Sequence, residues 1–212
     1  MHLQTRRESL QGPAGLLELL FDVPDAATYP QPLGVAVIAH PHPLMGGTME
    51  NKVVQTVARA CAQTGWLAVR FNFRGVGASQ GVYDEGRGEL QDLLAVIAHC
   101  APSGPLTLAG FSFGAFVTSH AAQALQGVRP IERLVLVGTA AGRFAVAPVP
   151  APLHAHTLVL HGEQDDTVPL ANALDWARPQ NLPVTVLPGV GHFFHGQLLL
   201  LRALVARHMA LP

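Results

Sequence analysis

The chain has 212 residues, and its content of 49% hydrophobic and 13% charged residues fits one compact domain rather than a disordered segment. Its 13 basic and 14 acidic residues give a formal net charge of −1, which argues against a dedicated binder of nucleic acid or of membrane surfaces.

Apolar runs of strand length alternate along the chain with segments of helical periodicity. Strands are expected over residues 16–23, 33–39, 66–73, 106–109, 133–137, 157–160 and 184–187. Helices are expected over residues 51–63, 89–100, 115–125, 170–177 and 197–208. Strands that are apolar on both faces, alternating with helices, indicate a parallel sheet covered on both sides. We therefore predict an α/β fold: a single domain over residues 1–212 with a mostly parallel, doubly wound sheet flanked by helices.

A candidate nucleophile lies between the expected strand 106–109 and the helix that follows it. Residues 110–114 read GFSFG and match G-x-S-x-G in its strand–turn–helix context. A serine in such a tight turn projects its Oγ above the sheet, and the two glycines leave room where strand and helix approach each other. The pattern therefore predicts Ser112 as a nucleophile.

A serine hydroxyl needs an adjacent base, and that base needs a group that orients it. Two later loops offer these groups, because residues 161–169 read HGEQDDTVP and residues 188–195 read PGVGHFFH. Both loops follow the carboxyl ends of expected strands, where parallel sheets build their sites. The chain order Ser112, an aspartate, then His192 is the order of the α/β-hydrolase triad.

Two further segments complete a family pattern. Residues 40–51 read HPHPLMGGTMEN, and residues 74–81 read RGVGASQG. With the motifs above, the chain resembles the α/β-hydrolase superfamily and, within it, a small bacterial, dienelactone-hydrolase-like group that carries H-P-H-P…G-G-x-M-x-N. The resemblance implies an α/β-hydrolase fold without a lid or cap domain. Where many relatives insert a helical lid, this chain has only a proline-broken connector over residues 140–156.

The resemblance also assigns the acid and the oxyanion hole. In the family the acid is the first Asp of G-x-x-D-x-x-V-P, which is Asp165 here, with Asp166 as the fallback. Phe113, directly after the nucleophile, supplies one backbone N–H to the oxyanion. Relatives with H-G-x take the second donor from the residue after the glycine. Since Pro41 stands at the glycine position and has no N–H, the matching donor is His42.

Apolar side chains beside these loops are candidates for a substrate wall. They are Leu44, Met45, Phe193 and Phe194, although core packing explains them equally well. Without a lid, the pocket should be open and favour small or exposed acyl groups. The sequence thus predicts a serine hydrolase of a carboxylic ester or a related thioester, lactone or amide, with no metal and no cofactor.

Two other functions fit parts of the sequence. His40 and His42 at a strand end, with further His and Asp residues nearby, could form the cluster of a metal-dependent hydrolase. That reading leaves the G-x-S-x-G turn unexplained, and we expect His40 instead to hold the oxyanion loop by hydrogen bonds. A non-catalytic binding scaffold of the same fold is the other alternative.

Location and partners follow from what the sequence lacks. No apolar run approaches the ~20 residues of a membrane span, and no apolar stretch follows the first arginines as it would in a secretory signal. Cys61 and Cys100 have no metal-binding spacing and are expected as reduced thiols. We therefore expect a cytoplasmic protein that acts on a small-molecule acyl substrate, without nucleic acid or membrane partners. The helix over residues 197–208 could support a homodimer.

Overall fold

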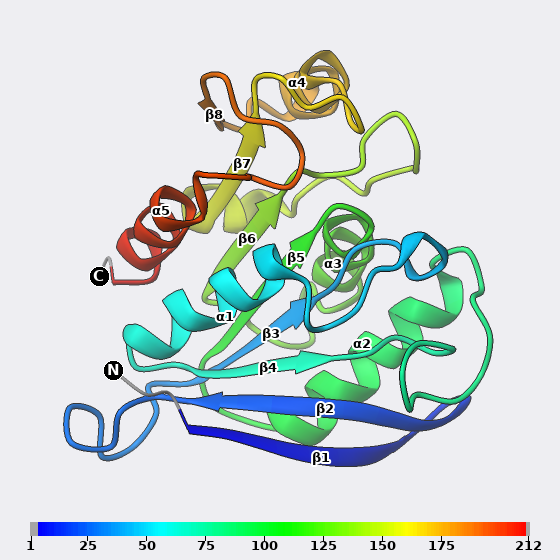
Figure 1. The fold of residues 1–212 in the computed structure, drawn as a ribbon, viewed down its shortest axis with the longest axis vertical. Helices are drawn as coiled ribbons and strands as arrows, with labels where there is room; N and C mark the ends of the chain where they lie inside the picture. Colours follow the sequence, from blue (N-terminus) through cyan, green and yellow to red (C-terminus); the bar gives the residue numbers. More distant parts are fainter. Residues whose placement is uncertain (1–3, 211–212) are drawn as a thin grey trace.

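One sheet of eight strands runs through the protein in the order β1-β2-β4-β3-β5-β6-β7-β8 (Figure 1). The structure is a computed structural model that describes residues 4–210. The strands are β1 (Gln4–Gly12), β2 (Gly15–Val23), β3 (Val35–Ala39), β4 (Leu67–Phe71), β5 (Leu106–Phe111), β6 (Arg133–Val137), β7 (Thr157–Gly162) and β8 (Val184–Leu187). β2 pairs antiparallel with β1 and β4, and the remaining neighbours pair parallel. The predicted mostly parallel, doubly wound sheet is confirmed.

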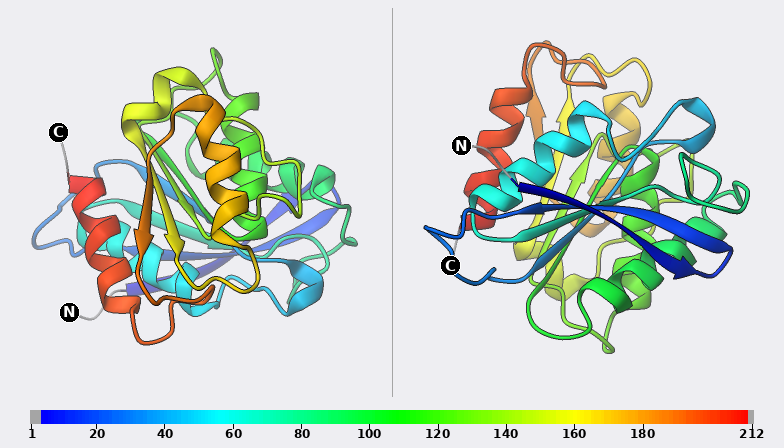
Figure 2. Two further views of the ribbon diagram at one scale, coloured as in Figure 1. Left: turned by 90° about the horizontal axis from the view of Figure 1, so that it is seen from above. Right: turned by 60° about the horizontal axis from the view of Figure 1, so that its bottom comes forward.

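Helices cover both faces of this sheet, as Figure 2 shows from two further sides. They are α1 (Lys52–Gln63), α2 (Arg87–Cys100), α3 (Phe113–Ala124), α4 (Leu170–Ala177) and α5 (Leu198–Ala210). Apolar residues of α1 and α5 pack with one set of strand side chains, and those of α2, α3 and α4 pack with another. The sheet is therefore buried on both sides, which explains its near-continuous apolar strands.

The structure differs from the predicted elements mainly at the start of the chain. β1 was not predicted, because its sequence QTRRESLQG is polar and mostly exposed, and it forms a hairpin with β2 at the edge of the sheet. Short 3-10 helices add to the loops, namely η1 (Pro43–Met45), η2 (Ala151–His156) and η3 (Arg178–Gln180). The connector over residues 140–156 contains η2 and no lid, as the sequence predicted.

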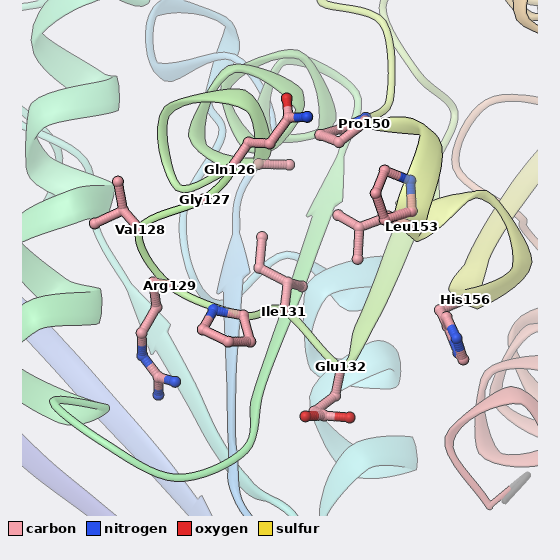
Figure 3. A pocket seen from close by; sticks show the side chains of 12 residues that line it. Gln126, Gly127, Val128, Arg129, Ile131, Glu132, Pro150, Leu153 and His156 are labelled. Carbon is pink, nitrogen blue, oxygen red and sulfur yellow. The ribbon is translucent and has the colours of Figure 1, made fainter.

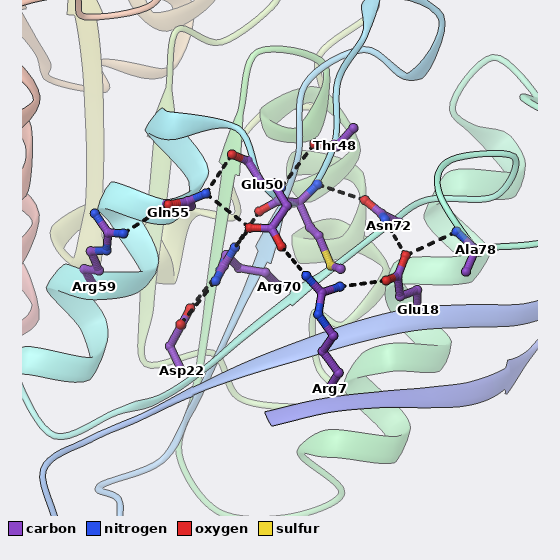
Figure 4. A network of polar contacts seen from close by, with 11 residues as sticks. Arg7, Glu18, Asp22, Thr48, Glu50, Gln55, Arg59, Arg70, Asn72 and Ala78 are labelled. Atoms are coloured by element: carbon purple, nitrogen blue, oxygen red, sulfur yellow. Dashed lines mark hydrogen bonds and ion pairs between the residues drawn. The ribbon is translucent and has the colours of Figure 1, made fainter. Parts of the chain in front are cut away.

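A buried ion pair fixes the segment that leads into α1 (Figure 4). The Arg70 guanidinium donates to both carboxylate oxygens of Asp22, at 2.7 and 3.2 Å, and to the carbonyl of Met49 at 2.8 Å. The side chain of Asn72 accepts a hydrogen bond from the N–H of Met49 at 2.9 Å. Arg70 of β4 and Asn72 of the turn after β4 thus hold Met49, in the segment 46–51, in place. Breaking such a buried pair costs about 3–5 kcal/mol, because it leaves one charge uncompensated.

Within residues 4–210, no helix is both long enough and apolar enough to cross a membrane. α5 carries the exposed side chains of Leu199 and Leu200. A homodimer through this helix stays a prediction.

Candidate active site

Ser112 occupies a sharp turn between β5 and α3. Its backbone has φ 56° and ψ −117°, a positive-φ conformation that costs a non-glycine residue about 1–3 kcal/mol. The N–H of Ser112 donates to the carbonyl of Val137 at 2.8 Å and holds the turn against β6. A Cβ added at Gly110 would lie 2.4 Å from the Gly114 carbonyl oxygen, and one at Gly114 would lie 2.3 Å from the Ala39 carbonyl oxygen. Both glycines of the motif are therefore required by close backbone approach.

Ser112, His192 and Asp165 form one hydrogen-bonded chain. The Nδ1 atom of His192 lies 2.7 Å from an Asp165 carboxylate oxygen, and its Nε2 lies 3.0 Å from the Ser112 Oγ. An ionised carboxylate only accepts hydrogen bonds, so the His192 Nδ1–H donates to Asp165 and Nε2 accepts from the serine hydroxyl. All three side chains are buried. Asp166 is exposed and lies outside this chain, so of the two candidate acids the structure brings Asp165 to His192.

Backbone hydrogen bonds fix the Asp165 carboxylate in addition to its bond with the His192 imidazole. One of its oxygens accepts the N–H groups of Thr167 and Val168, at 3.0 and 2.7 Å. Burial opposes its ionisation, but the hydrogen bonds from His192 and Val168 outweigh burial and lower the pKa of Asp165. His161 adds an Nε2–H that donates to the Val168 carbonyl at 2.9 Å and lies 3.5 Å from Asp165. Asp165 is thus held ionised and aimed at the base.

His40 ties the loop after β3 to the turn after β4. Its Nδ1–H donates to the Pro41 carbonyl at 2.6 Å, and its Nε2 accepts the N–H of Phe73 at 3.0 Å. Burial lowers the pKa of His40 to about 4, so the ring is neutral. Both ring nitrogens are thereby used by the backbone and are not available to a metal ion. Among the described residues, no group of three His, Cys, Asp or Glu side chains is arranged to hold one.

The two predicted oxyanion donors both face the same cavity. Phe113 is the first residue of α3, where a backbone N–H has no carbonyl within the helix to bond. His42 precedes η1, and its ring packs on that of Phe113 with centroids 5.0 Å apart. In residues 4–210, no loop or cap hydrogen bond uses either N–H. His42 and Phe113 line the cavity together with Ser112. Their role as oxyanion donors stays a prediction.

This catalytic cavity has a volume of about 290 Å³. Its wall includes His42, Met45, Asn51, Ser112, Phe113, Arg143, Phe144, Thr167, His192 and Phe193. Of the four apolar residues predicted for the substrate wall, the structure brings Met45 and Phe193 to the cavity and leaves the other two away from it.

Leu44 and Phe194 do not line the cavity, for opposite reasons. Leu44 is 69% exposed and points into solvent. Phe194 is fully buried and packs in the core under α1 and α5. Its backbone has φ 54°, which turns consecutive side chains apart, so Phe193 reaches the cavity while Phe194 enters the core. The assignment of Phe194 to the substrate wall was wrong. The alternative prediction, that Phe194 packs in the core, is confirmed.

Among the wall residues that the sequence analysis did not single out are two in the connector. Arg143 and Phe144 lie in the proline-rich connector, which the sequence suggested only as a lid-less link. Both also line a neighbouring hollow of about 450 Å³, to which Tyr83 contributes as well. One sequence feature could have identified them: an arginine followed by an aromatic residue lies shortly after β6, and loops at that edge of the sheet face the site.

A further hollow lies elsewhere (Figure 3). It has a volume of about 600 Å³ and is lined by residues that precede β6 and β7, among them Val128, Ile131, Pro150 and Leu153. These residues stand at the amino-terminal edge of the sheet, opposite the edge that carries Ser112. It contains none of the candidate site residues.

Comparison with known proteins agrees with the fold described above. Residues 21–137 match the family model described as X-Pro dipeptidyl-peptidase (S15 family). The match includes Ser112 and ends before Asp165 and His192. An uncharacterized protein of Rickettsia prowazekii is 30% identical over 200 residues, which covers 86% of this chain and 79% of that protein.

Solved structures extend the likeness over nearly the whole chain. An α/β serine hydrolase without a lid from Xanthomonas campestris superposes with a TM-score of 0.85 at 35% identity, covering 98% of this chain and 94% of that chain. An α/β serine hydrolase homologue from Coxiella burnetii gives a TM-score of 0.80 at 37% identity, covering 98% and 99%.

Proposed function

The chain belongs to the α/β-hydrolase superfamily, among the serine hydrolases without a lid, and from that premise we propose that it cleaves a small carboxylic ester or a related acyl substrate through a Ser112–His192–Asp165 triad. The observation that carries the proposal is the hydrogen-bonded chain from the Ser112 Oγ through His192 to Asp165, which opens into the catalytic cavity.

Ser112 acts as the nucleophile. As its Oγ attacks the carbonyl carbon, the His192 Nε2 takes the hydroxyl proton, and Asp165 holds the imidazole in the tautomer that accepts it. The charge of Asp165 then stabilises the imidazolium. The strained backbone at Ser112 supports this role, because such strain is found where a side chain must be held in one functional position.

The N–H groups of Phe113 and His42 bind the oxyanion. One such donor contributes about 2.7–4 kcal/mol to the transition state. The second donor depends on the loop after β3, and His40 supports that loop through its bonds to Pro41 and Phe73. His40 therefore acts as a positioning residue.

The acyl-enzyme is released by water. His192 protonates the leaving group, which departs through the open cavity. His192 then takes a proton from a water molecule that attacks the acyl carbon. Ser112 recovers its proton from His192 in the last step. No step needs a metal or an organic cofactor.

The test uses a fluorophosphonate probe and a panel of nitrophenyl esters of increasing acyl length. Wild type should be labelled and should turn over the esters, whereas Ser112→Ala and His192→Ala should not. The S15 family contains X-Pro peptidases, so the panel includes Ala-Pro nitroanilide, and a faster rate on it than on the esters would move the proposal from ester to amide. Equal rates in wild type and both variants would refute the triad. Absence of both labelling and turnover would favour a binding scaffold.

A further inference from the structure

Arg143 stands out in the wall of the catalytic cavity by its charge. Of the residues that line this cavity, it is the single one of type Arg, Lys, Asp or Glu. The rest of the wall is built from aromatic and aliphatic side chains, glycines and neutral polar groups. A guanidinium keeps its charge at all accessible pH values. Arg143 is exposed to solvent and lines this cavity, so its charge is available to a substrate bound there.

Other charged groups around the site are already matched. The Arg74 guanidinium pairs with buried Asp92 at 2.7 Å, and the Glu89 carboxylate accepts the N–H groups of Asp84 and Gly86, at 2.9 and 2.8 Å. By contrast, no carboxylate in residues 4–210 lies within 4.0 Å of the Arg143 guanidinium. Its field reaches the oxyanion loop: burial lowers the pKa of His42 most, the charge of Glu89 raises it, and the smaller effect of the Arg143 charge lowers it.

The backbone that presents Arg143 is fixed. The N–H groups of Arg143 and Phe144 both donate to the Ala140 carbonyl, at 3.3 and 3.1 Å. Gly142 has φ 77°, and a Cβ there would lie 2.4 Å from the side-chain nitrogen of Asn172, so the turn packs against α4. This turn cannot swing away without losing those contacts.

Phe144 anchors the other end of the turn. Its ring stacks on Phe116, with centroids 4.9 Å apart at 21°, and meets Phe113 edge-on at 5.2 Å. Since Phe113 directly follows Ser112, this aromatic cluster ties the position of Arg143 to that of the nucleophile. Arg143 itself is exposed, so water partly screens an ion pair formed at its guanidinium.

We propose that Arg143 binds a carboxylate carried by the substrate, so that this site prefers acyl substrates that bear an anionic group beside the scissile ester. The inference rests on the proposed hydrolase function. The planar guanidinium fork donates two parallel N–H groups, which match the two oxygens of a carboxylate. A cationic substrate would be repelled, and a neutral one would leave the guanidinium without a partner.

A carboxylate in the neighbouring hollow restricts where the anion can lie. Glu85 lines that hollow but not the catalytic cavity, and it lies 3.7 Å from Arg87. A second negative charge would be repelled near Glu85. The favoured position is therefore on the Ser112 side of Arg143.

The first test compares matched neutral and anionic esters. Nitrophenyl butyrate and the mono-nitrophenyl ester of succinic acid differ by a terminal methyl against a carboxylate. Nitrophenyl acetate and the acetyl ester of a hydroxynitrobenzoic acid place the carboxylate on the leaving side instead. We expect kcat/KM of wild type to favour the anionic member of at least one pair about tenfold, the size of a charge-assisted hydrogen bond at a partly exposed site. Added salt should reduce this preference.

Variants assign the preference to Arg143. In Arg143→Gln the ratio of kcat/KM for the anionic ester to kcat/KM for its neutral partner should fall to about one, through a higher KM for the anionic ester. Arg143→Lys should keep about a third of the preference, because the charge remains without the fork. Arg178→Gln removes an exposed arginine remote from the cavity and should keep the full preference. No preference in wild type, or one that survives Arg143→Gln, would overturn the inference.

A binding measurement separates this inference from the proposed function. Succinate monoamide is titrated calorimetrically into Ser112→Ala, with and without Arg143→Gln, and the second change should weaken binding about tenfold. Equal affinities would contradict the role of Arg143. If wild type turned over no ester while this difference in binding was found, the hydrolase proposal would fail and the anion site would stand.

Discussion

The Nε2 atom of His40 accepts a hydrogen bond from the backbone N–H of Phe73 at 3.0 Å. The bond joins the loop after β3, which carries the proposed oxyanion donor His42, to the turn after β4. It requires a neutral imidazole, because a protonated Nε2 cannot accept. The protonation of one buried ring is therefore coupled to the shape of the oxyanion hole.

We expect this coupling to appear in the pH dependence of stability. The pKa of His40 is about 4 in the folded protein, against an ordinary value of 6.5. Between those values the unfolded chain binds the extra proton, so stability falls as the pH decreases through this window, and the effect levels off below pH 4. At pH 4 the loss from His40 is about 3 kcal/mol relative to pH 7. Urea unfolding at a series of pH values measures it.

His40→Gln is the comparison for that experiment. The variant should be less stable at pH 7, and its free energy of unfolding should decline less between pH 7 and pH 4. His208, whose pKa burial lowers to about 4, keeps part of the slope in both proteins. Asp165 has a lowered pKa, so its stabilising contribution is lost below the ordinary carboxyl pKa and does not obscure this window. An unchanged slope in the variant would contradict the assignment to His40.

Asp165 and Asp166 are adjacent, and replacing each carboxylate in turn with an amide shows which of the two is the triad acid. Asp165→Asn should lower kcat about 10⁴-fold, because an amide no longer selects the imidazole tautomer that accepts the serine proton. Asp166→Asn changes an exposed side chain and should leave kcat/KM within about twofold of wild type. Circular dichroism of both variants checks that the fold is kept. The reverse ranking would place the acid at Asp166.

Sequence reasoning found the elements whose residues obey one strong pattern. The apolar strands β3 to β7 are largely buried on both faces, so their runs of Val, Leu and Ile identify them. Ser112 was found because backbone sterics demand glycine on both sides of the turn. Asp165 needed the family resemblance, since spacing does not separate it from its neighbour Asp166.

What the sequence could not predict depends on contacts between distant segments. β1 is polar and exposed, and only its pairing with β2 makes it a strand. Phe144 belongs to the site because Phe116 and Phe113, on another element, offer rings for it to pack against. No local periodicity carries that information.

The glycines of the nucleophile turn give a prediction about stability. Gly114→Ala would place a methyl group 2.3 Å from the Ala39 carbonyl oxygen, a backbone atom within the sheet that cannot move aside. We expect a loss of about 3 kcal/mol, at the upper end of overpacking costs. Gly191→Ala is the matched control, because its Cβ would meet only the Gln164 carbonyl oxygen at an ordinary 3.6 Å. Urea unfolding of both variants measures the difference, and equal stabilities would show that the turn is more pliable than its geometry indicates.

Phe193 and Phe194 should respond oppositely to truncation, although they are neighbours in the chain. Phe194 is fully buried among the side chains under α1 and α5, so Phe194→Ala should cost about 3–5 kcal/mol of folding free energy. Phe193 is 44% exposed and lines the catalytic cavity, so Phe193→Ala should lose little stability. Its effect should be a higher KM for esters with bulky acyl groups at a nearly unchanged kcat, because it removes binding shared by the ground state and the transition state. If Phe193→Ala proved as destabilising as Phe194→Ala and left KM unchanged for every ester, Phe193 would be a core residue as well and the cavity wall would need another apolar side.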